Sequence, residues 1–180
     1  ISSYSIWWLL IHCDLYRATG NFEYLKEQKD YLCGLMSLLA SFVDDDGCEH
    51  MPENRFLDWP NNANPGAIHA GLQGLLKIAL DKGGELLGAL GEDSIADKCA
   101  ESAKRMYKHV PDCCGSKQAA ALLVLSGLAD AEKINKEILS PGGAHGYSTF
   151  FGYYLLAAKA MAECSPWGLR HSGRISTLTG

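Results

Sequence analysis

The chain has 180 residues, of which 47% are hydrophobic and 21% are charged, and its formal net charge is −5. This is the composition of an ordinary globular protein that can bury a sizeable core. The negative charge disfavours nucleic acid or an anionic membrane as the main partner, because both are anionic and bind basic protein surfaces preferentially. The longest apolar runs, 6–11 and 119–125, are far too short to span a bilayer.

Seven cysteines are present, without paired CxxC modules. We therefore expect mostly buried free thiols, which lean toward a cytoplasmic location and leave a periplasmic one open. The residues that could gather a zinc ion are Cys99, His109, Cys113 and Cys114. Their spacing matches no regular zinc motif, so the sequence leads us to assign no metal.

Helical periodicity dominates the first 43 residues. Residues 5–17 predict a strongly apolar helix that ends at Thr19-Gly20. Asn21 is predicted to cap a second helix that runs to about Val43. Because only three or four residues join these helices, we expect them to lie antiparallel as a hairpin.

Two further helices follow a long loop. Asn64-Pro65 predicts a helix start, with asparagine as the cap and proline as the first helical residue. Gly83-Gly84 is expected to break or bend that helix. Ser94 and Asp97 resemble a capping box for the next helix, which extends to about residue 109.

The remaining helical segments are shorter. Ser116 is predicted to cap an alanine- and leucine-rich helix, a sixth helix ends near Ser140, and a seventh spans Phe150 to Glu163. We therefore expect an all-α fold of antiparallel helical hairpins over residues 1–164. The last 16 residues, 165–180, contain no acidic residue and no helical stripe, so we expect an atypical tail that is disordered or foreign to the fold.

The loop from Asp44 to Pro65 is the most unusual stretch, because its 22 residues contain three prolines and six carboxylates. Loops of this length inside compact domains usually carry function. Its centre places Asp58 beside Trp59. A carbohydrate site needs this pairing, since the ring stacks on the apolar face of a sugar while the carboxylate accepts hydrogen bonds from hydroxyl groups.

The motif Phe56-Leu57-Asp58-Trp59, followed by Asn61 to Pro65 and a new helix, resembles the catalytic domain of bacterial α-L-rhamnosidases. The hairpin turn from Tyr16 to Phe22 also resembles that family. So does the Gly142-Gly143 turn that leads into the segment from Ser148 to Phe151. The resemblance covers about residues 1–164.

The resemblance implies an (α/α)6 barrel of six radial hairpins, of which this chain would contain about three and a half. It also implies inverting hydrolysis of terminal α-L-rhamnosides without a cofactor. Such chemistry uses two carboxyls, one that protonates the leaving oxygen and one that activates water. The family's acid motif lies upstream of the equivalent of Ser5, and its base lies beyond the last acidic residue here, Glu163. We therefore expect the isolated chain to be inactive.

The candidate site residues are interpreted as follows. Asp58 and Trp59 are expected to bind the sugar, although an aspartate turn and a tryptophan lid over the core would explain the same residues. Asn61 and His145 are further candidates for binding hydroxyl groups. The weak candidates for catalysis are Glu49 and Glu53.

Three functions remain open. The first is part of a rhamnoside-hydrolysing domain, and the second is another six-hairpin carbohydrate enzyme, such as a glucuronyl hydrolase or a lyase. The third is a non-catalytic helical scaffold that binds a protein partner, which we would expect to have short, similar loops. Part of a barrel would leave an apolar face uncovered, so we also expect self-association.

Overall fold

The structure is a computed structural model and describes residues 2–52 and 54–164. Across these ranges the only regular secondary structure is helical, which confirms the all-α fold. The α-helices are α1 (Ser2–Thr19), α2 (Phe22–Glu27), α3 (Lys29–Ser41), α4 (Pro65–Ala89), α5 (Asp93–Arg105), α6 (Lys117–Leu125), α7 (Ala131–Ile134) and α8 (Gly152–Glu163). The shorter elements are two 3-10 turns, η1 (Trp59–Asn61) and η2 (Met106–Lys108), and a π-helical turn, η3 (Asn135–Leu139).

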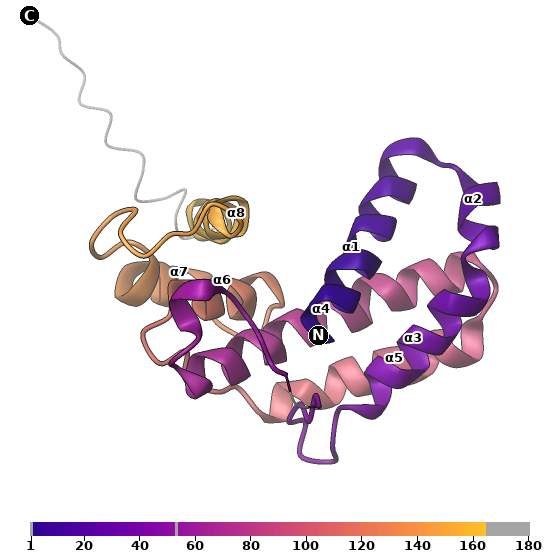
Figure 1. The fold of residues 1–180 in the computed structure, drawn as a ribbon, viewed down its shortest axis with the longest axis horizontal. Coiled ribbons are helices and arrows are strands. Elements are labelled where there is room, and N and C mark those ends of the chain that lie inside the picture. The colour runs from indigo at the N-terminus through magenta and orange to yellow at the C-terminus, as the bar shows by residue number, and fades with distance from the viewer. Residues whose placement is uncertain (1, 53, 165–180) are drawn as a thin grey trace, which may run out of the picture.

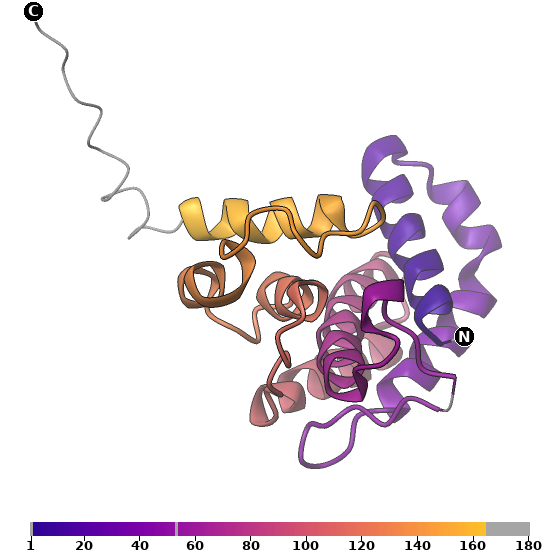
Figure 2. The ribbon, with the colours of Figure 1, turned by 60° about the vertical axis from the view of Figure 1, so that its left-hand side comes forward.

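The helices form two layers. One layer is the series α1, α4, α6 and α8, in which each helix packs on the next. The other layer contains α3 and α5, which pack on α4, and α7 with η3, which pack on α6 and α8. Figure 1 shows the series as an arc, and Figure 2 shows α8, in yellow, running above α6 and α7. Successive helices of the series α1, α4, α6 and α8 thus lie side by side.

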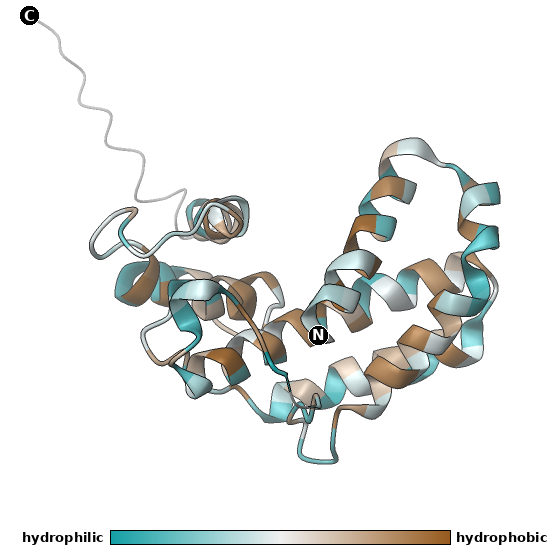
Figure 3. Ribbon diagram, viewed as in Figure 1, coloured by the Kyte–Doolittle hydropathy of each residue, from teal (hydrophilic) through white to brown (hydrophobic). Residues whose placement is uncertain are grey.

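Helices α4 and α6 form the centre of the core. The side chains of Leu72, Leu75 and Leu80 are fully buried or nearly so, as are those of α6 from Ala119 to Val124. The two backbones approach closely at Gly74, where an added Cβ would lie 2.7 Å from the carbonyl carbon of Leu122. Hydrophobic residues run along α4 and α6 in Figure 3.

The expected single helix from Asn21 to Val43 is divided at Gln28, which corrects the prediction. Asn21 caps α2 as predicted, by accepting a hydrogen bond from the backbone N–H of Tyr24. The two halves have different packing partners, because α2 contacts α1 whereas α3 contacts α4 and α5. A continuous periodic stripe does not show that its two halves pack against different helices.

Two further predictions are corrected, namely a break in α4 at Gly83-Gly84 and a cap of α5 at Ser94. Gly83-Gly84 does not interrupt α4, and an added Cβ on Gly83 would lie 2.4 Å from the sulfur of Met36, so this glycine makes room for α3. Ser94 does not cap α5, because Glu92 is already the N-cap residue. The N–H of Glu92 donates to the carbonyl of Leu87 at 2.9 Å, so the end of α4 holds Glu92 in this position.

The seven cysteines are all free thiols, of which Cys13, Cys99 and Cys113 are buried. None of the helices in the described ranges is both long and apolar enough to cross a membrane. The tail 165–180, for which we expect disorder or foreign origin, lies outside the described residues.

Candidate functional site

The long loop returns across the start of α1 and encloses a pocket of about 210 Å³. The residues that line it are Ser3, Tyr4, Trp7, Phe56, Leu57, Asp58, Trp59 and Phe150. The pocket therefore joins three segments that are far apart in the chain, and among the described residues that line it Asp58 is the one with a carboxylate.

Aromatic rings form most of the pocket wall. Tyr4 and Phe56 stack with ring centroids 6.4 Å apart, and Phe56 meets Trp59 edge to face at 5.3 Å. Across the pocket, Trp7 meets Phe150 edge to face at 5.2 Å. Trp59 is 76% exposed, so it does not cover the core as a structural lid would. Its face is available to a ligand.

Asp58 is buried, and its carboxylate accepts hydrogen bonds at both oxygens. Oδ1 accepts from the backbone N–H of Trp59 at 2.9 Å, which caps η1. Oδ2 accepts from Nε2 of Gln118 at 3.2 Å, and the same nitrogen donates to the carbonyl of Gly146 at 2.9 Å. The turn reading of Asp58 is thus correct as local structure. Asp58 can still accept hydrogen bonds from a ligand, because each carboxylate oxygen can accept more than one hydrogen bond.

The other predicted binding residues lie near this point but outside the pocket lining. Asn61 is buried in η1, and its Nδ2 makes no hydrogen bond. His145 is exposed in the loop before α8, and Gln118 connects the neighbouring Gly146 to Asp58. The loop containing His145 and the long loop therefore meet at the same end of the helices, as the alternation of hairpins predicts.

Glu49 does not reach the aromatic pocket. Its side chain is fully buried and forms an ion pair with Arg55, which accounts for this carboxylate without catalysis. Its Oε1 also contacts Nδ1 of His69 at 2.7 Å, and its Oε2 accepts from the N–H of Met51 at 2.9 Å. Glu53, its suggested partner, lies outside the described residues.

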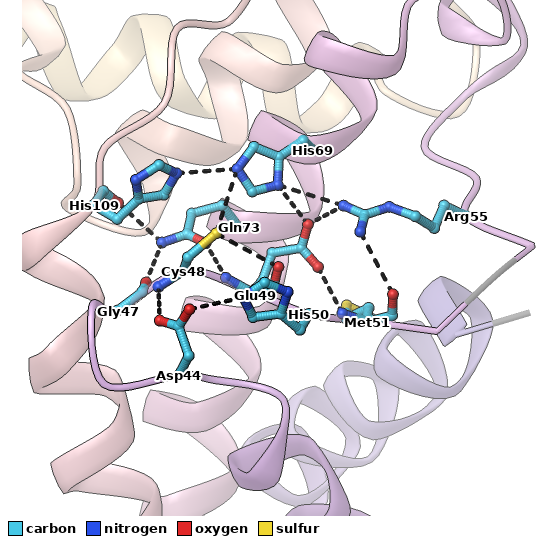
Figure 4. Close-up of polar contacts among 10 residues, drawn as sticks. All are labelled: Asp44, Gly47, Cys48, Glu49, His50, Met51, Arg55, His69, Gln73 and His109. Atoms are coloured by element: carbon cyan, nitrogen blue, oxygen red, sulfur yellow. Dashed lines mark hydrogen bonds and ion pairs between the residues drawn. The ribbon is translucent and has the colours of Figure 1, made fainter.

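A second polar cluster, shown in Figure 4, was not predicted from the sequence. It brings Cys48 of the long loop to His69 of α4, with Sγ and Nε2 3.8 Å apart. His109, which follows η2, places its Nε2 3.0 Å from Nε2 of His69. We refer to Cys48, His69 and His109 as the Cys-His-His cluster. Their atoms all lie within 4.8 Å of one another, and all three side chains are half-buried.

Gln73 fixes the backbone around this cluster. Its Oε1 accepts from the N–H of Glu49 at 2.9 Å, while its Nε2 donates to the carbonyls of Gly47 and His109 at 2.8 and 2.9 Å. One side chain of α4 thereby holds both segments that carry the other members of the cluster. His69 and Gln73 are polar residues at i and i+4 of α4, and this spacing places the two side chains on one face of the helix.

The surroundings of Cys48 raise the pKa of its thiol. Burial raises its pKa above the usual 9.0, and the carboxylates of Asp44 and Glu49 raise it further. In contrast, the pKa of Asp44 is lowered because its carboxylate accepts hydrogen bonds from the Cys48 backbone N–H and from His50. The long loop thus has an acidic outer turn and a neutral thiol behind it.

Comparisons with protein-family models, with curated proteins and with solved structures find no match to this chain.

Proposed function

We propose that this chain forms the sugar-binding part of a glycoside hydrolase domain that resembles α-L-rhamnosidases and hydrolyses terminal α-L-rhamnosides with inversion. The observation that supports the proposal best is the pocket itself, in which exposed aromatic faces surround one hydrogen-bonded carboxylate. Aromatic rings stack on the apolar faces of sugars, and a carboxylate accepts hydrogen bonds from sugar hydroxyl groups.

The size of the pocket is in keeping with a single sugar ring. Sites for drug-sized ligands typically occupy about 300–1,000 Å³, whereas this pocket has about 210 Å³. Trp59 provides the exposed platform, and Asp58 provides the fixed acceptor. The scaffold alternative has less support, since a binding solenoid needs no such pairing of aromatic rings and carboxylate in one long loop.

Hydrolysis needs more than the pocket. An inverting mechanism uses two carboxyls about 6.5–9.5 Å apart, and among the described lining residues only Asp58 has one. Glu49 is committed to Arg55 and His69. We therefore propose that the acid and the base come from outside this chain, and that no cofactor is required.

The proposal is tested by titrating the 180-residue chain with L-rhamnose and following tryptophan fluorescence. Millimolar binding, about −4 kcal/mol, is expected, with no turnover of aryl α-L-rhamnosides. Trp59→Ala should weaken binding by about tenfold or more, because the stacking platform is lost. Tyr153→Ala is the matched control, since Tyr153 is 74% exposed and lies outside the pocket.

In a complete domain, Asp58→Ala and Trp59→Ala should each cost roughly 2–4 kcal/mol in kcat/KM, the scale of one preorganised contact. Turnover by the 180-residue chain alone would show that the catalytic carboxylates have been misplaced. Rhamnose binding that survives Trp59→Ala unchanged would show that the pocket is not the sugar site.

A further inference from the structure

The Cys-His-His cluster contains the ligand types that transition metals prefer. Its nitrogens and sulfur come from three separate segments, namely the long loop, α4 and the segment after η2. Imidazole and thiolate groups are the usual ligands of zinc in proteins, and catalytic zinc sites have three protein ligands with the fourth position open. No residue of the cluster lines the aromatic pocket, so the cluster is a separate site.

Two of the three distances between the ligand atoms are close to those of a tetrahedral zinc site, and the third pair, Cys48 and His109, lies within 4.8 Å. Around such an ion, with bonds of about 2.0–2.1 Å to nitrogen and about 2.3 Å to sulfur, two nitrogens lie roughly 3.3 Å apart, and nitrogen and sulfur lie roughly 3.5 Å apart. The structure has 3.0 Å between the two histidine Nε2 atoms and 3.8 Å between Cys48 Sγ and His69 Nε2. Shifts of a few tenths of an ångström would accommodate the ion.

The surroundings of His69 direct the required nitrogen toward the cluster. An ionised Glu49 carboxylate can only accept, so Nδ1–H of His69 donates to it at 2.7 Å. Nε2 of His69 then presents its lone pair to Cys48 and His109. A carboxylate that holds the far nitrogen of a ligating histidine is a recurring feature of metal sites, where it fixes the tautomer and the orientation of the ring. The ion pair with Arg55 in turn holds Glu49.

We propose that Cys48, His69 and His109 bind a divalent transition metal ion of the zinc type. The ion connects the long loop to α4 and to the segment after η2, and its fourth position is open to water or to another ligand. Binding requires the loss of the proton from Cys48, and of any proton on the Nε2 atoms, so affinity increases with pH until the ligands are deprotonated. The half-burial of all three side chains leaves a route for the ion.

Two other arrangements use the same atoms. In the first, His109 Nε2–H simply donates to His69 Nε2, and no metal is involved. In the second, Cys48 joins Asp44 and His50 on the outer turn, where the relevant atoms also lie within 4.8 Å of one another. The carboxylate–histidine contact of His69 favours the Cys-His-His cluster over the outer turn. The experiment separates all three.

The test titrates the metal-free, reduced chain with Zn²⁺ by calorimetry and with Co²⁺ by absorption. We expect one ion per chain and a thiolate-to-cobalt charge-transfer band. His69→Gln and His109→Gln should each weaken Zn²⁺ binding by at least 100-fold, and Cys48→Ser should also abolish the cobalt band. Glu49→Gln should weaken binding by about 10- to 100-fold, as loss of an outer-shell carboxylate does.

The matched controls are Cys33→Ser, at another half-buried cysteine, and His145→Gln, at an exposed histidine. Both should leave the affinity unchanged, as should Cys114→Ser and Cys164→Ser at the exposed thiols. Circular dichroism checks that each variant is folded. Absence of the cobalt band in the wild-type chain would overturn the proposal whatever the variants do. Binding that is lost in Asp44→Asn and His50→Gln, but kept in His69→Gln, would overturn it in favour of the outer turn.

Discussion

The side-chain amide of Gln118 donates a hydrogen bond to the buried carboxylate of Asp58, which lies 60 residues earlier in the chain. The same amide donates to the carbonyl of Gly146, so one side chain of α6 connects the long loop to the loop before α8. The position of Asp58 in the pocket therefore depends on a residue that the loop sequence does not contain.

Gln118→Leu should destabilise the protein by about 1–3 kcal/mol, because it leaves a buried carboxylate oxygen and a carbonyl without their shared donor. Urea unfolding followed by circular dichroism measures this free energy. Gln28→Leu is the control, since Gln28 is half-buried and makes no side-chain cap bond. Equal effects of the two substitutions would contradict the connecting role of Gln118.

The sequence predicted the features of this fold that depend on neighbours in the chain. Asn21, Asn64 and Ser116 are helix caps as expected, because capping involves residues only two or three positions away. The Cys-His-His cluster was missed because its members are 21 and 40 residues apart. Helical periodicity does not specify which polar residues of different hairpins will meet.

The same limit applies to the roles of carboxylates. Glu49 and Asp58 are both acidic residues of one long loop, and no local pattern separates them. In the structure Glu49 is paired with Arg55, whereas Asp58 lines the aromatic pocket. The difference arises from α4 and α6, which provide His69 to one carboxylate and Gln118 to the other.

Asp44 should make the stability of the long loop depend on pH. The Cys48 N–H and His50 hold the pKa of Asp44 below its usual 3.8. A carboxyl with a lowered folded-state pKa stabilises the protein above its unfolded-state pKa, and this contribution is lost as the pH falls through the folded-state pKa. The difference in Tm between the wild type and Asp44→Asn should therefore be largest near neutral pH and shrink as the pH falls below 3.8.

Thermal unfolding followed at a series of pH values measures this difference. Asp45→Asn is the control, because Asp45 is the exposed neighbour of Asp44. A difference between wild type and Asp44→Asn that grows as the solution is acidified would contradict the assigned direction of the pKa shift.

Self-association remains a prediction. We expect it to occur at the two ends of the helix series. Helices α1 and α8 are the first and last of the series α1, α4, α6 and α8. Both present large apolar side chains to solvent, with Ile11 64% and Leu156 63% exposed. Sedimentation velocity should show association that increases with concentration and is weakened by Leu156→Lys.

Leu38→Lys is the matched control for that experiment, since Leu38 is 52% exposed on α3 in the other layer. It should leave association unchanged. A compact monomer at high concentration in the wild type would count against an uncovered end of the helix series.

Two glycines of α4 should respond to alanine in opposite directions. At Gly74 an added Cβ would lie 2.7 Å from the carbonyl carbon of Leu122 and 2.8 Å from its oxygen, so α4 and α6 would have to move apart. Backbone atoms have no rotamer that relieves such a contact, and overpacking of this kind costs roughly 1–3 kcal/mol. At Gly88 an added Cβ meets nothing within 4 Å.

Gly88→Ala should therefore stabilise the protein by about 0.5–1 kcal/mol, because alanine loses less backbone entropy than glycine in a helix. Both substitutions replace glycine by alanine in the same helix, so both gain the same helix propensity. The difference between their effects on the free energy of unfolding therefore measures the contact with α6. Denaturant unfolding of both variants measures it. Stabilisation by Gly74→Ala would show that α4 and α6 are not held at the separation seen here. The position of Asp58 in the pocket, which depends on Gln118 of α6, would then also be in error.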